Sequence, residues 1–257
     1  MGQHFLSNLP AARRMVEKFG PRQGEHVLEI GPGRGVLTTL LLDAGARVTA
    51  IELDAGLAES LGQRLAGYPG FRLVAGNVLR CDLAELAEGG PARVLANLPY
   101  AITGEVLMRL FGAASALTGM MLMLQREVVN RMVAAPGGRV YGSLSVLSQY
   151  FTEPRVVMSL SPGSFTPPPA VSSSVVDMPF RALRELSPAD EGRYPAFVRM
   201  IFAHRRRTLL NNLKLAGLPA DEALAAAGID GSRRPETLSR SECLALFAVC
   251  GTGRGGS

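Results

Sequence analysis

The chain has 257 residues, and 47% of them are hydrophobic, which is enough to bury the core of one α/β domain together with a smaller appended domain. Its formal net charge is +5 at pH 7, the sign expected of a protein that binds nucleic acid. The longest apolar stretch, residues 117–124, is far shorter than the ~20 residues of a membrane-spanning helix, so we expect no membrane partner. Cys81, Cys243 and Cys250 show neither C-x-x-C nor metal-ligand spacing, which predicts reduced thiols in a cytoplasmic protein and no bound metal.

Strand-like and helix-like segments alternate over the first two thirds of the chain. The predicted strands are 26–30, 46–53, 71–75, 93–96, 119–124, 155–160 and 173–180, and the predicted helices are 36–43, 56–65, 83–87, 104–111, 127–133 and 142–150. Such alternation is typical of a parallel sheet with helices on both faces. From residue 194 onward every predicted element is helical, the first helix spanning about 195–215, which places a domain boundary near 181–186.

The first predicted strand leads directly into a glycine-rich turn. Gly31, Gly33 and Gly35 precede the helix 36–43, and bare backbone at such a turn lets a ligand approach closely. Glu52 ends the next strand about twenty residues later, where a carboxylate can bind both hydroxyls of a ribose. NAD and S-adenosylmethionine both fit this arrangement.

Glycine spacing and charge distinguish between these two cofactors. The dinucleotide fingerprint has two residues between its second and third glycines, whereas Arg34 alone separates Gly33 from Gly35. Glu29, directly before the turn, would repel a pyrophosphate but suits the sulfonium and ammonium groups of S-adenosylmethionine. The turn therefore favours the methyl donor.

A second motif, Asn97-Leu98-Pro99-Tyr100, follows the predicted strand 93–96 at the end where ligands bind in open α/β sheets. The Asn97 side-chain carbonyl can accept a hydrogen bond from an exocyclic amino group. Pro99 keeps Leu98 extended, so that the Leu98 carbonyl points outward, and Tyr100 offers a ring on which a base can stack. The alternative is a turn that merely closes a buried strand.

Two further segments fit a nucleic-acid substrate. The Phe-Thr-Pro-Pro-Pro stretch at 165–169 predicts a stiff loop that holds Phe165 across the pocket from Tyr100, so that the two rings bracket a base; a plain surface loop is the alternative. Arg205, Arg206 and Arg207 fall within the predicted helix 195–215 and would fan over more than half of its circumference. Phosphate contact is the favoured interpretation, and a solvated helix face is the alternative.

Taken in chain order, these motifs resemble the small-subunit ribosomal RNA adenine dimethyltransferases of the KsgA type. The resemblance rests on Gln3-His4-Phe5-Leu6 and on residues 29–33, 51–54, 97–100, 124–129, 141–146, 165–171, 205–209 and 234–239, and it covers nearly the whole chain. It implies a Rossmann-like class I S-adenosylmethionine-dependent methyltransferase domain at 1–182, with a seven-stranded, mostly parallel sheet. A helical C-terminal domain at 183–257 is then expected to contact the ribosomal RNA.

The activity implied by the resemblance is methyl transfer from S-adenosylmethionine to the exocyclic N6 of two adjacent adenosines near the 3′ end of small-subunit rRNA. The products would be N6,N6-dimethyladenosine and S-adenosylhomocysteine, the partner an immature 30S subunit late in biogenesis, and the enzyme a monomer. The implied catalytic residues are Asn97, Leu98, Tyr100 and Phe165; the cofactor-binding residues are His4, Leu6, Gly31, Gly33, Glu52, Asn77 and Asn97; the RNA-binding residues are Arg205, Arg206 and Arg207.

The sequence departs from the family in two places. Asn77 stands where the family commonly has Asp, at a position expected to face the adenine of the cofactor. Its amide can accept from the adenine amino group and donate to a ring nitrogen, so we expect binding to persist. A short basic extension usually precedes the Gln3 motif, whereas this sequence begins at Met1-Gly2. Either the start is truncated or the extension is dispensable, and its loss would weaken RNA contact rather than chemistry.

Two alternative functions stay open at this point. A large-subunit rRNA adenine methyltransferase of the macrolide-resistance type shares the Asn-x-Pro-aromatic motif, but the Gln3 motif, the Phe165 loop and the stretch 234–236 favour the small-subunit type. A mainly non-catalytic ribosome-assembly factor is the other alternative. The intact set of Gly31, Glu52, Asn97 and Tyr100 argues against lost chemistry.

Overall fold

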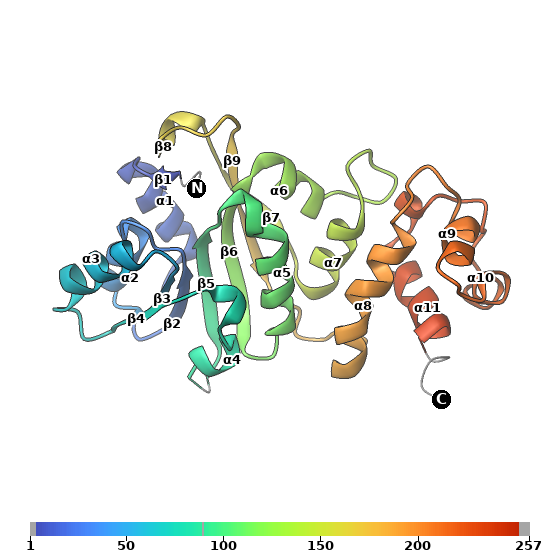
Figure 1. Ribbon diagram of the computed structural model, residues 1–257, viewed down its shortest axis with the longest axis horizontal. Helices are drawn as coiled ribbons and strands as arrows, with labels where there is room; N and C mark the ends of the chain where they lie inside the picture. The colour runs from blue at the N-terminus through green and yellow to red at the C-terminus, as the bar shows by residue number, and fades with distance from the viewer. Residues whose placement is uncertain (1–3, 89, 252–257) are drawn as a thin grey trace. The chain divides into compact units, whose positions relative to one another are not determined.

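The computed structural model describes residues 4–88 and 90–251, which fold into two compact units (Figure 1). The first unit comprises Met1–Val129 and Thr152–Phe180, and the second comprises Asn130–Phe151 and Arg181–Ser257. The C-terminal segment of the second unit starts at Arg181, and the unit also includes residues 130–151, which lie within the domain predicted over 1–182. No helix among the described residues is long and apolar enough to cross a membrane.

The first unit is built on a seven-stranded sheet with the order β4-β3-β2-β5-β6-β9-β7. Its strands are β2 (His26–Ile30), β3 (Arg47–Glu52), β4 (Phe71–Ala75), β5 (Ala92–Asn97), β6 (Leu117–Gln125), β7 (Arg155–Leu160) and β9 (Ser173–Pro179). Strands β2 to β6 run parallel, whereas β9 is antiparallel to both of its neighbours. The expected mostly parallel sheet is therefore confirmed.

Helices cover both faces of this sheet, as Figure 1 shows. The helical elements are α1 (Leu9–Phe19), α2 (Val36–Asp43), α3 (Ala55–Leu65), η1 (Val78–Arg80), α4 (Leu83–Leu86), η2 (Tyr100–Ile102), α5 (Thr103–Gly112) and η3 (Pro162–Ser164), and α6 (Arg126–Met132) runs into the second unit. Central strands bury both faces and therefore read as continuous apolar runs. In β5, Leu95 packs in the same core cluster as α1 to α3, while its neighbours Val94 and Ala96 are equally buried outside that cluster.

A two-stranded ribbon joins distant parts of the first unit. Strand β1 (Phe5–Leu6) pairs antiparallel with β8 (Phe165–Thr166), so that Leu6 lies opposite Phe165. The backbone N–H groups of Ser7 and Asn8 both donate to the Ser164 carbonyl. These bonds fix the start of the described chain against the Phe165 loop.

The second unit is wholly helical within the described residues. Its helices are α7 (Ser143–Phe151), α8 (Pro188–Ile201), α9 (Leu209–Leu215), α10 (Ala220–Ala227), η4 (Pro235–Thr237) and α11 (Arg240–Gly251). Aromatic rings form its core: Tyr194 lies 4.9 Å from Tyr150 and 5.2 Å from Phe247, measured between ring centroids. Because Tyr150 belongs to α7, this packing explains why 130–151 joins the C-terminal helices.

The structure contradicts the single helix predicted over 195–215. Helix α8 ends at Ile201, and α9 begins only at Leu209. Its N-cap is Thr208, whose side chain accepts a hydrogen bond from the Asn211 N–H. Arg205, Arg206 and Arg207 therefore lie in a loop rather than around a helix. A Thr directly before an apolar run is an N-cap signal that the sequence contained.

Candidate active site

The carboxyl ends of four neighbouring strands, β4, β3, β2 and β5, line one pocket of the first unit. The ribbon of β1 and β8 contributes further lining residues. Among the predicted site residues, those that line it are His4, Leu6, Gly31, Gly33, Glu52, Asn77, Asn97, Leu98 and Phe165. The Tyr100 backbone begins η2, but its side chain lies outside what the structure describes, as does all of Gln3. The position of the pocket is the one expected for ligands of open α/β sheets.

The glycine turn adopts a conformation that side chains rarely allow. Gly31, Gly33 and Gly35 have φ values of +67°, +55° and +68°. A Cβ atom on Gly33 would also lie only 3.0 Å from the ring of Phe5. Phe5 thus packs on the bare backbone of the turn and lines the pocket, a role that we did not predict although it lies inside the Gln3 motif.

Glu52 is held rigidly at the end of β3. It is 3% exposed, and its Oε2 and Oε1 atoms accept hydrogen bonds of 3.0 Å from the backbone N–H groups of Gly33 and Asp54. A carboxylate offers about four acceptor positions, so about two stay open toward a ligand. These bonds therefore fix the orientation of the Glu52 carboxylate and leave it able to bind hydroxyl groups.

Glu29, in β2, is a buried acid without a cation. It is 2% exposed, and its Oε2 atom has no hydrogen-bond partner among the described residues. Burial raises the pKa of Glu29 to about 7; the Thr38 hydroxyl opposes this shift and the charge of Glu52 adds to it. A positively charged ligand in this pocket would supply the missing counter-charge.

Asn77 and Leu53 lie on the side of the pocket formed by β4 and β3. The Asn77 Oδ1 atom accepts from the Leu79 N–H at 3.0 Å and so caps η1, which leaves the Nδ2 group as its hydrogen-bond donor. An amide oxygen can accept a second hydrogen bond, so the predicted contact between this carbonyl and an adenine amino group stays a prediction. Leu53 is 60% exposed, and an apolar side chain at the rim suits the face of a purine ring, a feature that we did not predict.

Asn97 contacts the start of the described chain. Its Nδ2 group donates to the His4 carbonyl at 3.3 Å, which leaves Oδ1 as the acceptor on the other branch of the amide. The His4 ring in turn lies 2.8 Å from the Pro167 carbonyl, measured from Nδ1. Phe165, also at the pocket, is only 4% exposed. The structure thus brings Asn97, His4 and Phe165 together, while the predicted pairing of Phe165 with the Tyr100 ring stays a prediction.

Comparison with known proteins gives the family. Residues 1–250 match the model of the family described as Ribosomal RNA adenine dimethylase. The chain belongs to this family. It is 38% identical over 249 residues, 97% of its length and 94% of the relative, to the Ribosomal RNA small subunit methyltransferase A of Xanthomonas campestris pv. campestris. With the protein of the same name from Pseudomonas putida it shares 40% identity over 240 residues, 92% of this chain and 88% of the relative.

Solved structures show the same fold. The crystal structure of the 23S rRNA methyltransferase ErmE has a TM-score of 0.72 and 26% identity, covering 96% of this chain and 99% of that chain. A dimethyladenosine transferase from Plasmodium falciparum has a TM-score of 0.82 at 24% identity, covering 96% and 98%, and shows the same fold. The expected Rossmann-like methyltransferase fold is therefore confirmed. The large-subunit alternative is not favoured, because relatives named for the small subunit share 38–40% identity.

The predicted RNA-binding residues of this adenine dimethylase lie in its second unit. Arg205, Arg206 and Arg207 are all exposed. The Arg205 Nη2 group donates to the Arg139 carbonyl at 2.9 Å. A loop that carries three adjacent guanidinium groups into solvent suits contact with phosphates.

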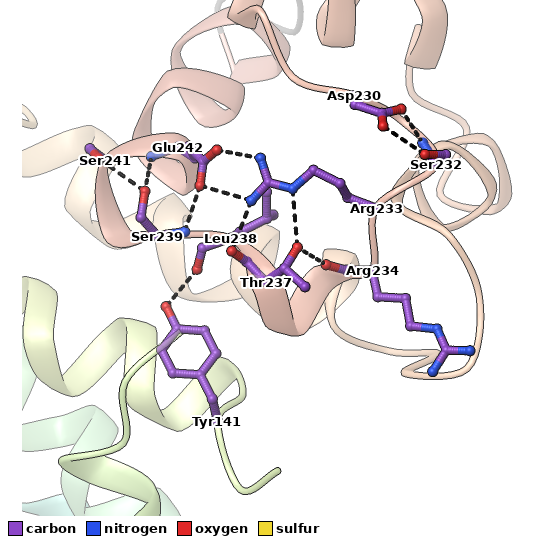
Figure 2. Close-up of polar contacts among 10 residues, drawn as sticks. All are labelled: Tyr141, Asp230, Ser232, Arg233, Arg234, Thr237, Leu238, Ser239, Ser241 and Glu242. Atoms are coloured by element: carbon purple, nitrogen blue, oxygen red, sulfur yellow. Dashed lines mark hydrogen bonds and ion pairs between the residues drawn. The ribbon is translucent and has the colours of Figure 1, made fainter. Parts of the chain in front are cut away.

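The family's closing motif, residues 234–239, forms part of a polar network that Figure 2 shows. Arg233 donates from Nη2 to the Thr237 carbonyl at 2.8 Å and to Glu242 Oε2 at 3.2 Å. The Ser239 N–H donates to Glu242 Oε2 at 2.8 Å, and the Glu242 N–H donates to the Ser239 hydroxyl at 3.2 Å, a reciprocal capping box at the start of α11. Tyr141 donates to the Leu238 carbonyl at 2.8 Å. The motif therefore serves as scaffold of the second unit.

Proposed function

We propose that this protein methylates small-subunit ribosomal RNA at the exocyclic N6 of two adjacent adenosines near the 3′ end, late in 30S biogenesis, to give N6,N6-dimethyladenosine. The observation that carries the proposal is the meeting of Glu52 and Asn97 in one pocket, a carboxylate for a ribose and an amide for a base. The curated relatives named for the small subunit support the choice of RNA.

The residues of the pocket fit S-adenosylmethionine, which supplies the methyl group when bound. The open acceptor positions of Glu52 bind the ribose hydroxyls. Glu29 Oε2, buried without a partner, balances the positive charge of the cofactor. Asn77 donates from Nδ2 to a nitrogen of the adenine ring, and its Oδ1 atom, which also caps η1, accepts from the adenine amino group. The rest of the cradle consists of Gly31, Gly33, His4 and Leu6.

The target adenine is bound by the motif after β5. Asn97 Oδ1 and the Leu98 carbonyl accept hydrogen bonds from the N6 amine, whose lone pair is otherwise delocalised into the ring. These two acceptors favour a pyramidal nitrogen and stabilise the positive charge that develops on it during the displacement. Tyr100 and Phe165 hold the base so that the amine lies within attacking distance of the methyl carbon. The proton leaves to water after transfer, and no side chain of the pocket is needed as a base.

The second unit provides the contact with the ribosome. Arg205, Arg206 and Arg207 bind phosphates of the rRNA, and the helical C-terminal domain docks on the immature 30S subunit. The enzyme acts as a monomer. Because phosphate contacts carry no sequence information, they set the orientation of the enzyme and leave the choice of base to the pocket.

One experiment tests this function against both alternatives. Unmethylated 30S subunits and naked 23S rRNA are each incubated with the full chain and labelled S-adenosylmethionine, and digests of the RNA are analysed by mass spectrometry. We expect N6,N6-dimethyladenosine in the small-subunit rRNA alone. Label in 23S rRNA would point to the large-subunit type of enzyme, and tight 30S binding without label would point to an assembly factor.

A further inference from the structure

The loop with the three arginines, residues 203–208, is closed by one side chain from the helix that follows it. Asn212, in the first turn of α9, is 1% exposed. Its Oδ1 atom accepts from the His204 N–H at 3.2 Å, and its Nδ2 group donates to the carbonyls of His204 and Thr208, both at 3.1 Å. The Arg207 carbonyl lies 3.5 Å from the same Nδ2 group. Asn212 therefore bonds both ends of the arginine loop.

An asparagine at this position is unexpected on packing grounds. Leu209 and Leu213 of the same helix are fully buried, and residue 212 lies on the face that they share. An apolar side chain would suit that face better, because asparagine is rarely buried and disfavours a helix interior. Since both the oxygen and the nitrogen of the amide bond the loop backbone, these bonds explain the presence of an asparagine.

The charges of the three arginines are available to a partner, although the Arg205 Nη2 group donates to the Arg139 carbonyl. Arg205, Arg206 and Arg207 are exposed, and among the described residues none of them pairs with a carboxylate. The loop backbone between the two bonded ends is short, so fixing His204 and Thr208 fixes the direction in which these side chains leave the surface. Order imposed before binding reduces the conformational entropy that is lost on binding.

We propose that Asn212 is a positioning residue for the RNA substrate: it preorganises the loop 203–208 so that Arg205, Arg206 and Arg207 reach phosphates of the small-subunit rRNA together. This inference rests on the proposed RNA contact of the three arginines. Asn212 itself touches no RNA, because it is buried beneath the loop that it holds.

The chain offers a matched control in the neighbouring residue. Asn211 has the same side chain but is exposed, and only its backbone N–H takes part in the cap of α9. Asn211→Ala therefore changes the same chemical group without touching the loop. Thermal unfolding followed by circular dichroism reports whether each variant is folded, including the second unit that carries the substitution.

Binding of the full chain to unmethylated 30S subunits is measured at several salt concentrations. We expect Asn212→Ala to weaken binding by about tenfold and to flatten the salt dependence, while Asn211→Ala stays within about twofold of the parent chain. The pair is repeated in a background in which all three arginines are replaced by Gln. There Asn212→Ala should change the affinity by less than about twofold, because a residue that acts through the arginines has nothing left to position.

The outcomes separate the two proposals. An equal loss from Asn212→Ala in both backgrounds, or no loss in the parent chain, overturns the positioning role. Parent-like affinity and salt slope in the triple Gln variant instead overturn the RNA contact of the arginines, whatever Asn212 does. If Asn212→Ala does not fold, Asn212→Asp replaces it in both backgrounds. This variant keeps the acceptor for the His204 N–H but lacks the donor. Asn211→Asp then matches its added charge.

Discussion

The pKa values of two glutamates, one in each unit, are shifted in opposite directions by their surroundings. Glu29, in the pocket of the first unit, is buried without a cation, and burial raises its pKa to about 7. Glu242, at the start of α11, is hydrogen-bonded by the Arg233 guanidinium, which lowers its pKa to about 2 against the opposing effect of its partial burial. Further hydrogen bonds from Ser239 act in the same direction as Arg233.

This difference distinguishes a binding site from a scaffold. In the pocket, Glu29 Oε2 has no partner, and Glu52 and Asn97 use only part of their hydrogen-bonding capacity. In the network of Figure 2, Arg233 and Glu242 bind each other and their neighbours. Buried polar groups of native proteins usually have hydrogen-bond partners, so the unused donors and acceptors of the pocket are available to a ligand. Substitutions in the pocket should therefore act on binding and chemistry, and substitutions in the network on stability.

The strongest test of this contrast is Asn97→Ala. We expect methyl transfer to fall by about 10²–10³-fold, because an acceptor directed at the developing charge is removed. Affinity for 30S subunits should stay within about twofold, since phosphate contacts dominate it. Single-turnover transfer of labelled methyl groups measures the first quantity. Asn97→Asp keeps an acceptor but cannot donate to the His4 carbonyl, so it should lose less; parent-like turnover in the Ala variant would remove Asn97 from the mechanism.

The next largest effect is expected from Glu52→Ala. Both ribose hydroxyls lose a charged acceptor, so S-adenosylmethionine should bind more weakly by about 2–4 kcal/mol. Calorimetric titration measures the affinity, and a melting curve shows how much the lost bonds from Gly33 and Asp54 matter to the fold. Glu59→Ala, on the exposed face of α3, is the control. Unchanged affinity in the Glu52 variant would exclude this carboxylate from the site.

The pocket was largely predictable from the sequence because its parts are local. Buried parallel strands read as continuous apolar runs, and Gly31, Glu52 and Asn97 stand at or just beyond their carboxyl ends. The use of the Asn77 carbonyl as the cap of η1 was not foreseen, since a short 3₁₀ turn leaves no periodic pattern.

Features that depend on distant contacts were missed. The ribbon of β1 and β8 has two residues in each strand, too few for any periodicity, so the packing of Phe5 on Gly33 was not foreseen. Helix α1 was not predicted, although Asn8 and Pro10 gave a start signal. Residues 202–208 were predicted as helix because the N-cap signal of Thr208 was overlooked, and because the bonds from Asn212 to His204 leave no pattern in the sequence.

The substitution Glu29→Gln tests whether the buried, unpaired carboxyl group of the pocket makes the stability of the protein depend on pH. The folded-state pKa of about 7 lies above the ordinary value of 4.5, so between these pH values the native state binds more protons than the unfolded state. Stability should therefore fall as pH rises through this window, by an amount on the order of 2–3 kcal/mol. The neutral Gln variant should lack this fall and be more stable than the parent chain at pH 8. Urea unfolding from pH 5 to 8 measures it, with the exposed Glu17→Gln as control; identical pH profiles for parent and Glu29→Gln would show that Glu29 is solvated.

The smallest effect is expected from Glu242→Gln in the network. Its pH dependence has the opposite sign to that of Glu29→Gln. The folded-state pKa of about 2 lies below the ordinary 4.5, so the pairing stabilises the protein above pH 4.5 and is lost as pH falls toward 2. Because the Glu242 and Arg233 side chains are 31% and 32% exposed, solvent screening limits the contribution to about 1–2 kcal/mol. Urea unfolding should show the variant less stable at pH 7, by a difference that shrinks as pH falls below 4.5 and is lost only near pH 2, while methyl transfer per folded molecule is unchanged. A variant with normal stability but impaired methyl transfer would show that this network takes part in function, and the distinction between a scaffold and a binding site would then be wrong.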